Sequence, residues 1–537
     1  MPSRRDVLMR LGKTRGWTSL IGLVAVAGAA LATPGLSSAL PVGDVGLPSG
    51  KENTSVIVQN AGTDAATIVM DVFRPDGTIV PGATRQQDNV PIGGVVNFPQ
   101  ALNNSLELGF RGLGVLSATQ AVNALIVRDI LNSLDQKSYS IASGAANGGR
   151  KLAVPIAFNE LLAGGSWNSR IAVVNTGTQI ACVKVTYFLL AGAGGSATTN
   201  QTIPDQPSGQ AGCSGGGYAV PVSGQVTFGR TGTGVTRFPV STDNNQMAVL
   251  IEVLNAGDNA VAANVDLYRS DGNRLLGGYE GLVINDAAPT TDDVGTDVVV
   301  PLTIKDPSGY YTVIGVLNVS GAAANVSIQY VGVDGGGNPV NQTVNLGSVT
   351  NAAFHSIYET SSIPVGFIGY ARITSDRTIG AMFVRGKQTV AFSGVNEPTY
   401  TAARAVPVDQ AASTWSLPLI FRRFTASGPY DGFNSWVQVQ VADGSTAQVT
   451  LRFVGDPVFG AGCPAGPYEI TVPVSGSRVF YMNLATALDN GFPAGQAPSC
   501  FFGGARVTAN KPVIVVSNVT SDLYANSDND GLYNGFK

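Results

Sequence analysis

One short stretch of the sequence is typical of a hydrolase nucleophile. Residues 212 to 216 read GCSGG, which fits the G-x-S-x-G pattern of a serine on a sharp turn between a strand and a helix. The stretch AGCSGGGYAVPVSG from Ala211 returns as AGCPAGPYEITVPVSG from Ala461, with Pro464 in place of the serine. The residues after the turn alternate like a strand, whereas a nucleophile elbow continues into a helix. We therefore interpret GCSGG as a structural turn.

The partners that hydrolytic chemistry needs are scarce. A triad requires a base, and the single histidine, His355, lies in NAAFHSIYET, a predicted strand or its edge. Carboxylates such as Glu252, Asp266 and Glu280 are scattered, and we interpret them as solvated turn residues instead of a glycosidase pair. We expect a protein that is not an enzyme and binds no organic cofactor.

The stretch NSDNDG, residues 526 to 531, is the best candidate for a metal site. Asn526, Asp528 and Asp530 offer oxygen atoms at positions one, three and five, and Gly531 follows at six, as in a Ca²⁺-binding loop. Position twelve is Lys537, where such a loop has a bidentate glutamate. A Ca²⁺ site and an acidic surface turn are the two interpretations.

Aromatic residues could bind carbohydrate if they formed an exposed platform. The densest cluster is SGPYDGFNSW, residues 427 to 436, in which Tyr430 and Phe433 are the candidates. Trp436 opens a strand that corresponds to the strand opened by Trp167. We expect these two tryptophans to be core anchors.

The four cysteines suggest disulfides formed in an oxidising compartment. Cys182 and Cys213 fall in one predicted domain, and Cys463 and Cys500 fall in another. We therefore expect the pairs 182–213 and 463–500. Zinc binding is disfavoured, because the sequence has no C-x-x-C and His355 is remote from the cysteines.

The charge composition narrows the classes of partner. Charged residues make up 13% of the chain, against about 25% in average soluble proteins, and the net charge is −4. No basic face marks a nucleic-acid partner. The surface must therefore be largely Ser, Thr, Asn, Gln and Gly.

Residues 1–39 are typical of a secretory signal peptide. Basic residues precede the apolar run Leu20 to Ala32, and small residues that suit cleavage end at Ala32 and at Ala39. SRRDVLM, residues 3 to 9, also resembles a twin-arginine signal, so Sec and twin-arginine export both remain open. The run is shorter than the ~20 residues that span a bilayer, and a membrane association would require that this predicted helix be retained. We expect an extracellular or cell-surface protein.

The rest of the chain repeats itself. GFRGLGVLSATQAVNALIVR, residues 109 to 128, aligns without gaps on GFIGYARITSDRTIGAMFVR, residues 366 to 385. Alternating strands around short polar turns recur, and short strands with a proline (VPIAF, VPLTI and LPLIF) introduce units. We predict β-sandwich domains at 40–149, 150–295, 296–404 and 405–537, with an extra hairpin or partial repeat at 251–280 in the second.

This arrangement resembles the tandem immunoglobulin-like or fibronectin-like repeats of bacterial cell-surface proteins. The resemblance covers residues 50 to 537 and rests on architecture and self-repetition. It implies an all-β fold of tandem antiparallel sandwiches after an N-terminal signal peptide helix.

We expect a secreted structural protein: an S-layer, sheath or filament subunit, or an adhesive stalk. Sandwiches that each close their own core suggest a rod, and the low charge favours contacts with further copies or with cell-surface components. The end of the chain, YNGFK, is either a strand for addition to another subunit or a frayed tail. The alternatives are a module that binds polysaccharide or another surface, and a tethered accessory subunit of an envelope membrane complex.

Overall fold

The computed structural model describes most of the chain after residue 50. The described ranges are 22–27, 51–107, 109–131, 137–144, 148–161, 167–190, 201–230, 234–257, 259–269, 276–284, 293–307, 309–387, 399–425, 432–456, 462–484, 491–521 and 530–537. Within these ranges the regular structure consists of β-strands and single 3₁₀ turns, without an α-helix. The all-β, antiparallel class predicted from the alternating pattern is therefore confirmed.

Unit 1 is a sandwich of two four-stranded sheets with the orders β1-β6-β3-β4 and β5-β2-β7-β8. In β3, alternate residues from Ala66 to Val72 are buried, and they pack on Val56 and Val58 of the opposite sheet. Period-two burial of this kind is what a strand with one core-facing side requires. The strands are β1 (Gly22–Ala27), β2 (Lys51–Asn60), β3 (Ala66–Phe73), β4 (Arg85–Val90), β5 (Val95–Pro99), β6 (Arg111–Ala118), β7 (Val122–Leu131) and β8 (Lys137–Ser143).

Unit 2 repeats this plan with one five-stranded and one six-stranded sheet, in the orders β15-β14-β10-β17-β18 and β12-β11-β16-β9-β19. The strand β13 pairs with β11 beside the second sheet. The strands are β9 (Lys151–Asn159), β10 (Trp167–Asn175), β11 (Ala181–Leu189), β12 (Gln201–Asp205), β13 (Tyr218–Val220), β14 (Gln225–Gly229), β15 (Val235–Arg237), β16 (Asn245–Val253), β17 (Val261–Arg269), β18 (Leu276–Glu280) and β19 (Leu282–Ile284).

The segment 251–280, for which we predicted an extra hairpin or partial repeat, contains the antiparallel pair of β17 and β18. This segment holds the end of β16, then β17 and β18, and β17 pairs with β10 as β7 pairs with β2. β16 and β17 are therefore the normal closing strands of the unit, placed in opposite sheets. The alternation of the segment gave no sign of this change of sheet.

Units 3 and 4 join the two closing strands into one long strand. β25 (Phe367–Lys387) and β33 (Phe501–Ser521) are each 21 residues long. The first half of β25 pairs with β20 and β22, and its second half pairs with β21 and β26. Each long strand thus passes from one layer of its sandwich to the other.

The remaining strands of unit 3 are β20 (Gly295–Lys305), β21 (Tyr310–Asn318), β22 (Ala324–Val333), β23 (Pro339–Val349), β24 (Ala352–Ser356), β26 (Thr399–Arg404) and β27 (Val406–Pro407). Those of unit 4 are β28 (Ala412–Arg422), β29 (Phe433–Val441), β30 (Thr446–Gly455), β31 (Tyr468–Ser475), β32 (Ser477–Tyr481) and β34 (Asp530–Asn534).

Two finer expectations, immunoglobulin-like domains and an N-terminal helix, are not confirmed. In an immunoglobulin domain, strands F and G are neighbours in one sheet, whereas β6 and β7 lie in opposite sheets here. Gly22–Ala27, inside the predicted signal peptide helix, forms the strand β1 beside β6. Among the described residues, no helix is long and apolar enough to cross a membrane.

The proline-containing strands have a common role in units 2 to 4. β9, β20 and β28 each lie beside the strand that corresponds to β6, which is the place of β1 in unit 1. In each of these units, a buried hydroxyl of the next strand accepts a hydrogen bond from the backbone N–H of the third residue after the proline. This bond joins the two layers of the sandwich. The pairs are Phe158 N–H to Ser169 Oγ (2.7 Å), Ile304 N–H to Thr312 Oγ1 (2.9 Å) and Phe421 N–H to Ser435 Oγ (3.0 Å).

An asparagine clamps the first hairpin in units 1 to 3. The side-chain amides of Asn60, Asn175 and Asn318 each donate to a carbonyl of a neighbouring strand at 2.9 Å, and each side-chain oxygen accepts a turn N–H two residues later. The clamp satisfies buried polar groups that would otherwise cost about 1–3 kcal/mol each. In unit 4 the corresponding residue is Val441.

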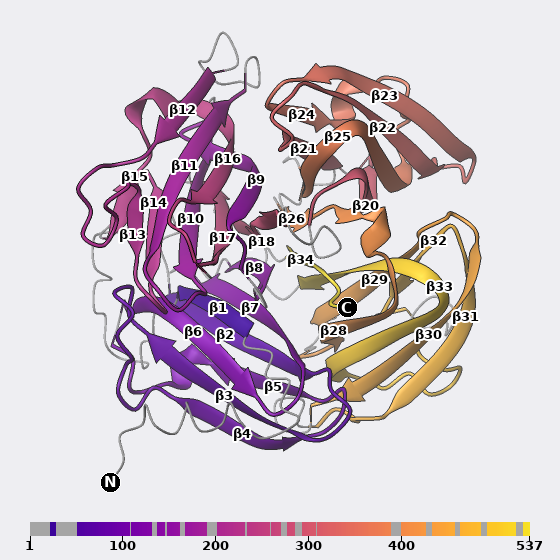
Figure 1. Cartoon of the computed structure of the whole chain (residues 1–537). Coiled ribbons are helices and arrows are strands. Elements are labelled where there is room, and N and C mark those ends of the chain that lie inside the picture. Colours follow the sequence, from indigo (N-terminus) through magenta and orange to yellow (C-terminus); the bar gives the residue numbers. More distant parts are fainter. Residues whose placement is uncertain are drawn as a thin grey trace.

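The four units form a closed ring and not a rod (Figure 1). Their last strands meet at its centre, where β8 contacts β18 and β34, and β26 contacts the same two strands. The tail expected to seek an acceptor or to fray pairs instead with its own unit, because β34 lies beside β33 and Phe536 bridges to Ser416.

The interfaces around the ring alternate in character. The core of unit 2 continues into unit 3 through Met382 and Val384, and the core of unit 4 continues into unit 1 through Leu125 and Val127. Between units 1 and 2, the buried apolar cluster consists of Leu113, Val174 and Ala262. Buried ion pairs stand at the other two seams, Arg128–Asp266 between units 1 and 2 and Arg385–Asp530 between units 3 and 4. Units 1 and 3 therefore correspond, as do the disulfide-bearing units 2 and 4.

The pair between Arg385 and Asp530 gives a stability prediction. Both side chains are almost fully buried, so Arg385→Met leaves an uncompensated carboxylate and should lower the free energy of unfolding by about 3–5 kcal/mol. The matched control is Arg372→Met, which breaks a half-exposed pair with Asp297 and should cost about 0–1 kcal/mol. Urea denaturation measures both, and equal losses would contradict the assigned role of Arg385.

Candidate functional site

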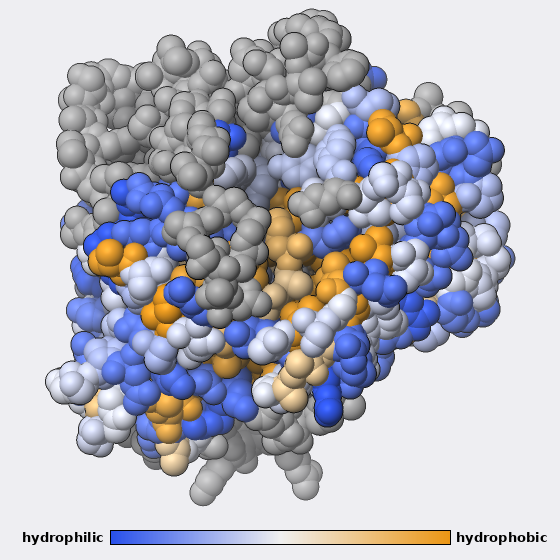
Figure 2. Space-filling view, turned by 90° about the horizontal axis from the view of Figure 1, so that it is seen from above, coloured by the Kyte–Doolittle hydropathy of each residue, from blue (hydrophilic) through white to orange (hydrophobic). Residues whose placement is uncertain are grey.

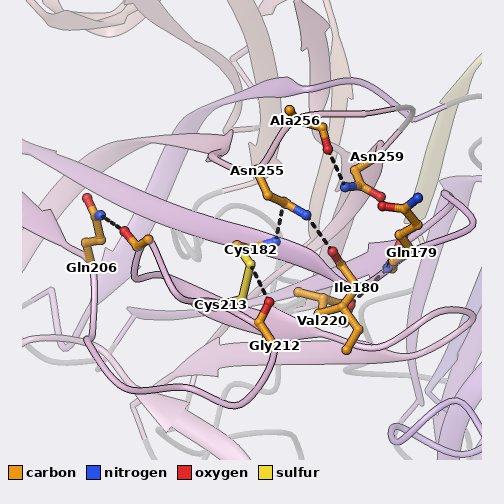
Figure 3. Close-up of a disulfide and its surroundings, with 12 residues drawn as sticks. Gln179, Ile180, Cys182, Gln206, Gly212, Cys213, Val220, Asn255, Ala256 and Asn259 are labelled. Carbon is orange, nitrogen blue, oxygen red and sulfur yellow. Dashed lines mark hydrogen bonds between the residues drawn. A yellow bond between two sulfur atoms is a disulfide. The ribbon is translucent and has the colours of Figure 1, made fainter.

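The GCSGG stretch is a disulfide-bearing turn. Cys213 is bonded to Cys182, and Gly212 and Gly216 both have positive φ. Ser214 is exposed, and the chain continues into the strand β13 where a nucleophile elbow requires a helix. In Figure 3 the turn lies against the end of β11, where the side-chain oxygen of Asn255 accepts the Cys182 N–H at 2.8 Å.

The second disulfide, Cys463–Cys500, stands in the matching place of unit 4. The two bridges span 31 and 37 residues, and loop-entropy estimates give each a stabilisation of about 4 kcal/mol. The structure therefore contains both pairs expected from the sequence.

Of the three predicted Ca²⁺ ligands, Asp530 lies among the residues that the structure describes. Asn526 and Asp528 lie outside the described residues. Asp530, in β34, is buried, and its carboxylate accepts hydrogen bonds from Arg385 and from Asn518. The guanidinium of Arg385 thus neutralises the carboxylate of Asp530, which a Ca²⁺ ion would have needed as a ligand. Among the described residues, no group of three His, Cys, Asp or Glu side chains could hold a metal.

Of the two aromatic candidates, Phe433 lies among the described residues. Tyr430 lies outside the described residues, and Phe433 is half-buried, with its ring 5.3 Å from that of Phe421 in the core. It therefore forms no exposed platform for a sugar.

The two tryptophans are partly buried against hydrophobic cores and also contact neighbouring units. Trp167 packs on Tyr400 of unit 3, with ring centroids 4.2 Å apart. Trp436 lies under the guanidinium of Arg385, which is 4.5 Å from its ring centroid. Neighbouring units bury these rings, which a unit considered alone cannot reveal.

His355 lies in β24 and is buried. Its Nε2 is 3.0 Å from Thr360 Oγ1, and its ring centroid is 6.1 Å from that of Tyr330. Burial lowers the pKa of His355 below its ordinary value of 6.5 because the charged form loses hydration. The imidazole is therefore neutral in the folded protein at pH 7.

The histidine makes stability depend on pH. Below pH 6.5 the imidazole of His355 binds a proton in the unfolded chain but stays neutral in the folded chain. The free energy of unfolding therefore falls by up to about 1.4 kcal/mol per pH unit until the pH reaches the pKa of the folded state. His355→Gln removes this component. Urea denaturation from pH 7.5 to pH 5 should give a shallower decline for the variant than for the wild type. Parallel curves would contradict a depressed pKa.

A basic hollow lies at the seam between units 1 and 2. Three arginines line it: Arg111 from β6, Arg128 from β7 and Arg170 from β10. Arg128 and Arg170 are 5% and 3% exposed, and Arg128 Nη1 is 2.5 Å from the carboxylate of Asp266. Among the described lining residues, Asp266 is the one acidic group, and the cavity volume is about 110 Å³.

The charges in this hollow act on one another. Burial first, and then the neighbouring Arg170 and Arg128, lower the pKa of Arg111 to about 9. Ser140, Gln225, Thr227 and Asn264 add polar side chains to the lining. This combination of guanidinium and neutral hydrogen-bonding groups suits an anion better than a cation.

The sequence analysis missed this cluster. The one available signal was in the gapless repeat, where Arg128 and Arg385 both end an apolar run, NALIVR or GAMFVR. A charged residue that recurs at the end of an otherwise buried strand indicates a buried partner. Arg170 lies 42 residues after Arg128 in the chain, and no local pattern connects it with Arg128 or Arg111.

The comparisons with known proteins add no relative. No family model, no curated protein and no solved structure matches the chain.

Proposed function

We propose that this protein is an exported structural subunit that acts through contacts with further copies of itself, as in a surface layer, sheath or filament. The two disulfides support an oxidising compartment outside the cytoplasm. The basic and then apolar start of the chain supports export through a signal peptide. The observation that carries the proposal is the edge strand of unit 3.

Among the described strands, β23 has a neighbour on one side only; it carries no charged residue, and its one proline, Pro339, is its first residue. Its 11 residues, PVNQTVNLGSV, pair with β22 on one side, and most of their side chains are exposed. An edge of this kind presents unpaired backbone N–H and C=O groups, which natural proteins usually protect with charges, prolines or short length. The exposed Asn341, Thr343 and Asn345 offer neutral hydrogen-bonding side chains instead.

The corresponding edges of the other units are protected. β4 carries Arg85 and Asp88, β12 is five residues long and contains Pro204, and β31 contains Glu469 and Pro473. On the face in Figure 2, hydrophilic residues cover most of the described surface, and hydrophobic residues form small separate patches and a central seam. The contrast favours β23 as the contact strand over a broad apolar interface.

Removal of the predicted signal peptide would also affect assembly. Cleavage after Ala32 or Ala39 would separate β1 from the rest of the chain and leave β6 without its neighbour on that side. A second open edge would then stand in unit 1, opposite in the ring to unit 3. Chains with edges in opposite units can join into rows.

The proposal predicts that charge on β23 blocks assembly. The double variant Thr343→Lys and Asn345→Lys brings like charges together when two edges meet, so the assembled fraction should fall at least about tenfold. Negative-stain electron microscopy and sedimentation of purified protein measure it, with circular dichroism as the check on folding.

Gln86→Lys, on the already charged edge β4, is the control and should assemble like the wild type. Ordered assemblies that survive both β23 substitutions would refute the edge contact. A wild-type chain that stays monomeric at high concentration would refute the structural function itself.

A further inference from the structure

The seam between units 1 and 2 has a counterpart within the same chain. Arg128 and Arg385 occupy the same place in the gapless repeat, and each enters a buried ion pair with the next unit. The seam between units 3 and 4 therefore shows which side chains fill the space beside the arginine when no bound group has to fit there.

At the seam of units 3 and 4, aromatic rings fill the space. Trp436 follows Ser435, the hydroxyl that joins the layers of unit 4, and pairs across the sheet with Tyr481. The two rings stack with centroids 5.6 Å apart, and the guanidinium of Arg385 lies over Trp436.

At the seam of units 1 and 2, the corresponding positions hold a charge and a glycine. Arg170 follows Ser169, the equivalent hydroxyl, so it takes the place of Trp436. Across the sheet stands Gly229, in the place of Tyr481, and a Cβ built on it would lie 3.2 Å from Val235 Cγ1. Where unit 4 has two stacked rings, unit 2 has the guanidinium of Arg170 and the side chain of Val235, and both line the hollow.

The hollow has the size and charge of an anion site. Its volume is about 110 Å³, and its described lining carries three guanidinium groups against one carboxylate. Planar guanidinium groups form paired hydrogen bonds with sulfate and phosphate oxygens. Arg111 is likewise a charged residue at a position where the corresponding residue of the other pair of units, Ile368 in unit 3, is apolar.

We propose that this hollow binds a small oxyanion, a sulfate or a phosphate group, held by Arg111, Arg128 and Arg170. The anion joins β6 and β7 of unit 1 to β10 of unit 2, so it fastens the seam that has the smallest apolar cluster. The group is either a free ion or an ester on a surface polysaccharide, since both present the same oxygen atoms.

Isothermal titration of the full chain with sodium sulfate and with sodium phosphate, at constant ionic strength, tests the proposal. We expect saturable binding of one anion per chain. Arg170→Gln and Arg111→Gln should each weaken the binding at least tenfold, and circular dichroism checks their folding. Asp266→Asn should strengthen it, because it removes the one acidic group of the described lining; loss of folding alone cannot produce that gain.

Two controls make the result specific. Arg377→Gln changes an exposed arginine of unit 3 and should leave the binding unchanged. Arg506→Gln alters a second basic hollow, at the seam of units 4 and 1, and should also leave it unchanged. Binding that Arg506→Gln abolishes and Arg170→Gln retains would overturn the proposal, as would the absence of saturable binding for both anions.

A third ligand distinguishes the sources of the oxyanion. A monosaccharide sulfate that competes with inorganic sulfate, and is likewise weakened by Arg170→Gln, identifies an ester group as an acceptable ligand. Inorganic sulfate that binds while the ester does not identifies a free structural ion. The test is independent of assembly through β23, so either proposal can fail without the other.

Discussion

The fold depends on the packing of four strands, β8, β18, β26 and β34, in a closed cycle at the centre of the ring. Each strand belongs to one sandwich and contacts the corresponding strands of the two neighbouring units. A sandwich taken out of the ring would expose that strand and the apolar residues beside it, such as Leu125 and Val127 of unit 1 or Met382 and Val384 of unit 3. The units therefore stabilise one another, and the ring is the smallest arrangement in which all four such surfaces are covered. This closure explains why buried charges at the seams are tolerated, because their partners are held in place from both sides.

The seams show how the ring is built from a repeated pair. Two seams continue the cores of units 2 and 4 into their neighbours, and the seam of units 2 and 3 also carries the partly buried pairs of Arg404 with Glu280 and Asp293. The other two seams combine apolar contacts with a buried arginine and a carboxylate. Hydrophobic packing is non-directional and supplies most of the stabilisation. A buried ion pair adds little net stability but strongly disfavours arrangements that leave one charge unpaired. The ion pairs at the seams of units 1 and 2 and of units 3 and 4 therefore favour the correct alignment of neighbouring units.

The local features of the fold could be predicted from the sequence, and the contacts between units could not. Alternation identified strands such as Ala66–Phe73 because one face of each strand meets a core within its own unit. The cysteine pairs followed from their positions in the repeat. The contacts of Trp167, Trp436 and Asp530 could not be predicted because their partners, Tyr400 and Arg385, belong to other units. A strand such as β16 or β17 also gives no local sign of the sheet that it joins.

Because units 2 and 4 correspond, a comparison of the two separates the residues that the fold requires from those that can vary. The joining hydroxyls, Ser169 and Ser435, are the same in units 2 and 4, so the fold requires them. The residues that follow them differ, since Trp436 stacks on Tyr481 at one seam and Arg170 lines a hollow at the other. Packing alone favours filled space, because an unfilled cavity costs dispersion contacts. A hollow with charged walls in one copy, where the other copy has stacked rings, is therefore the pattern expected where a bound group takes the place of a side chain.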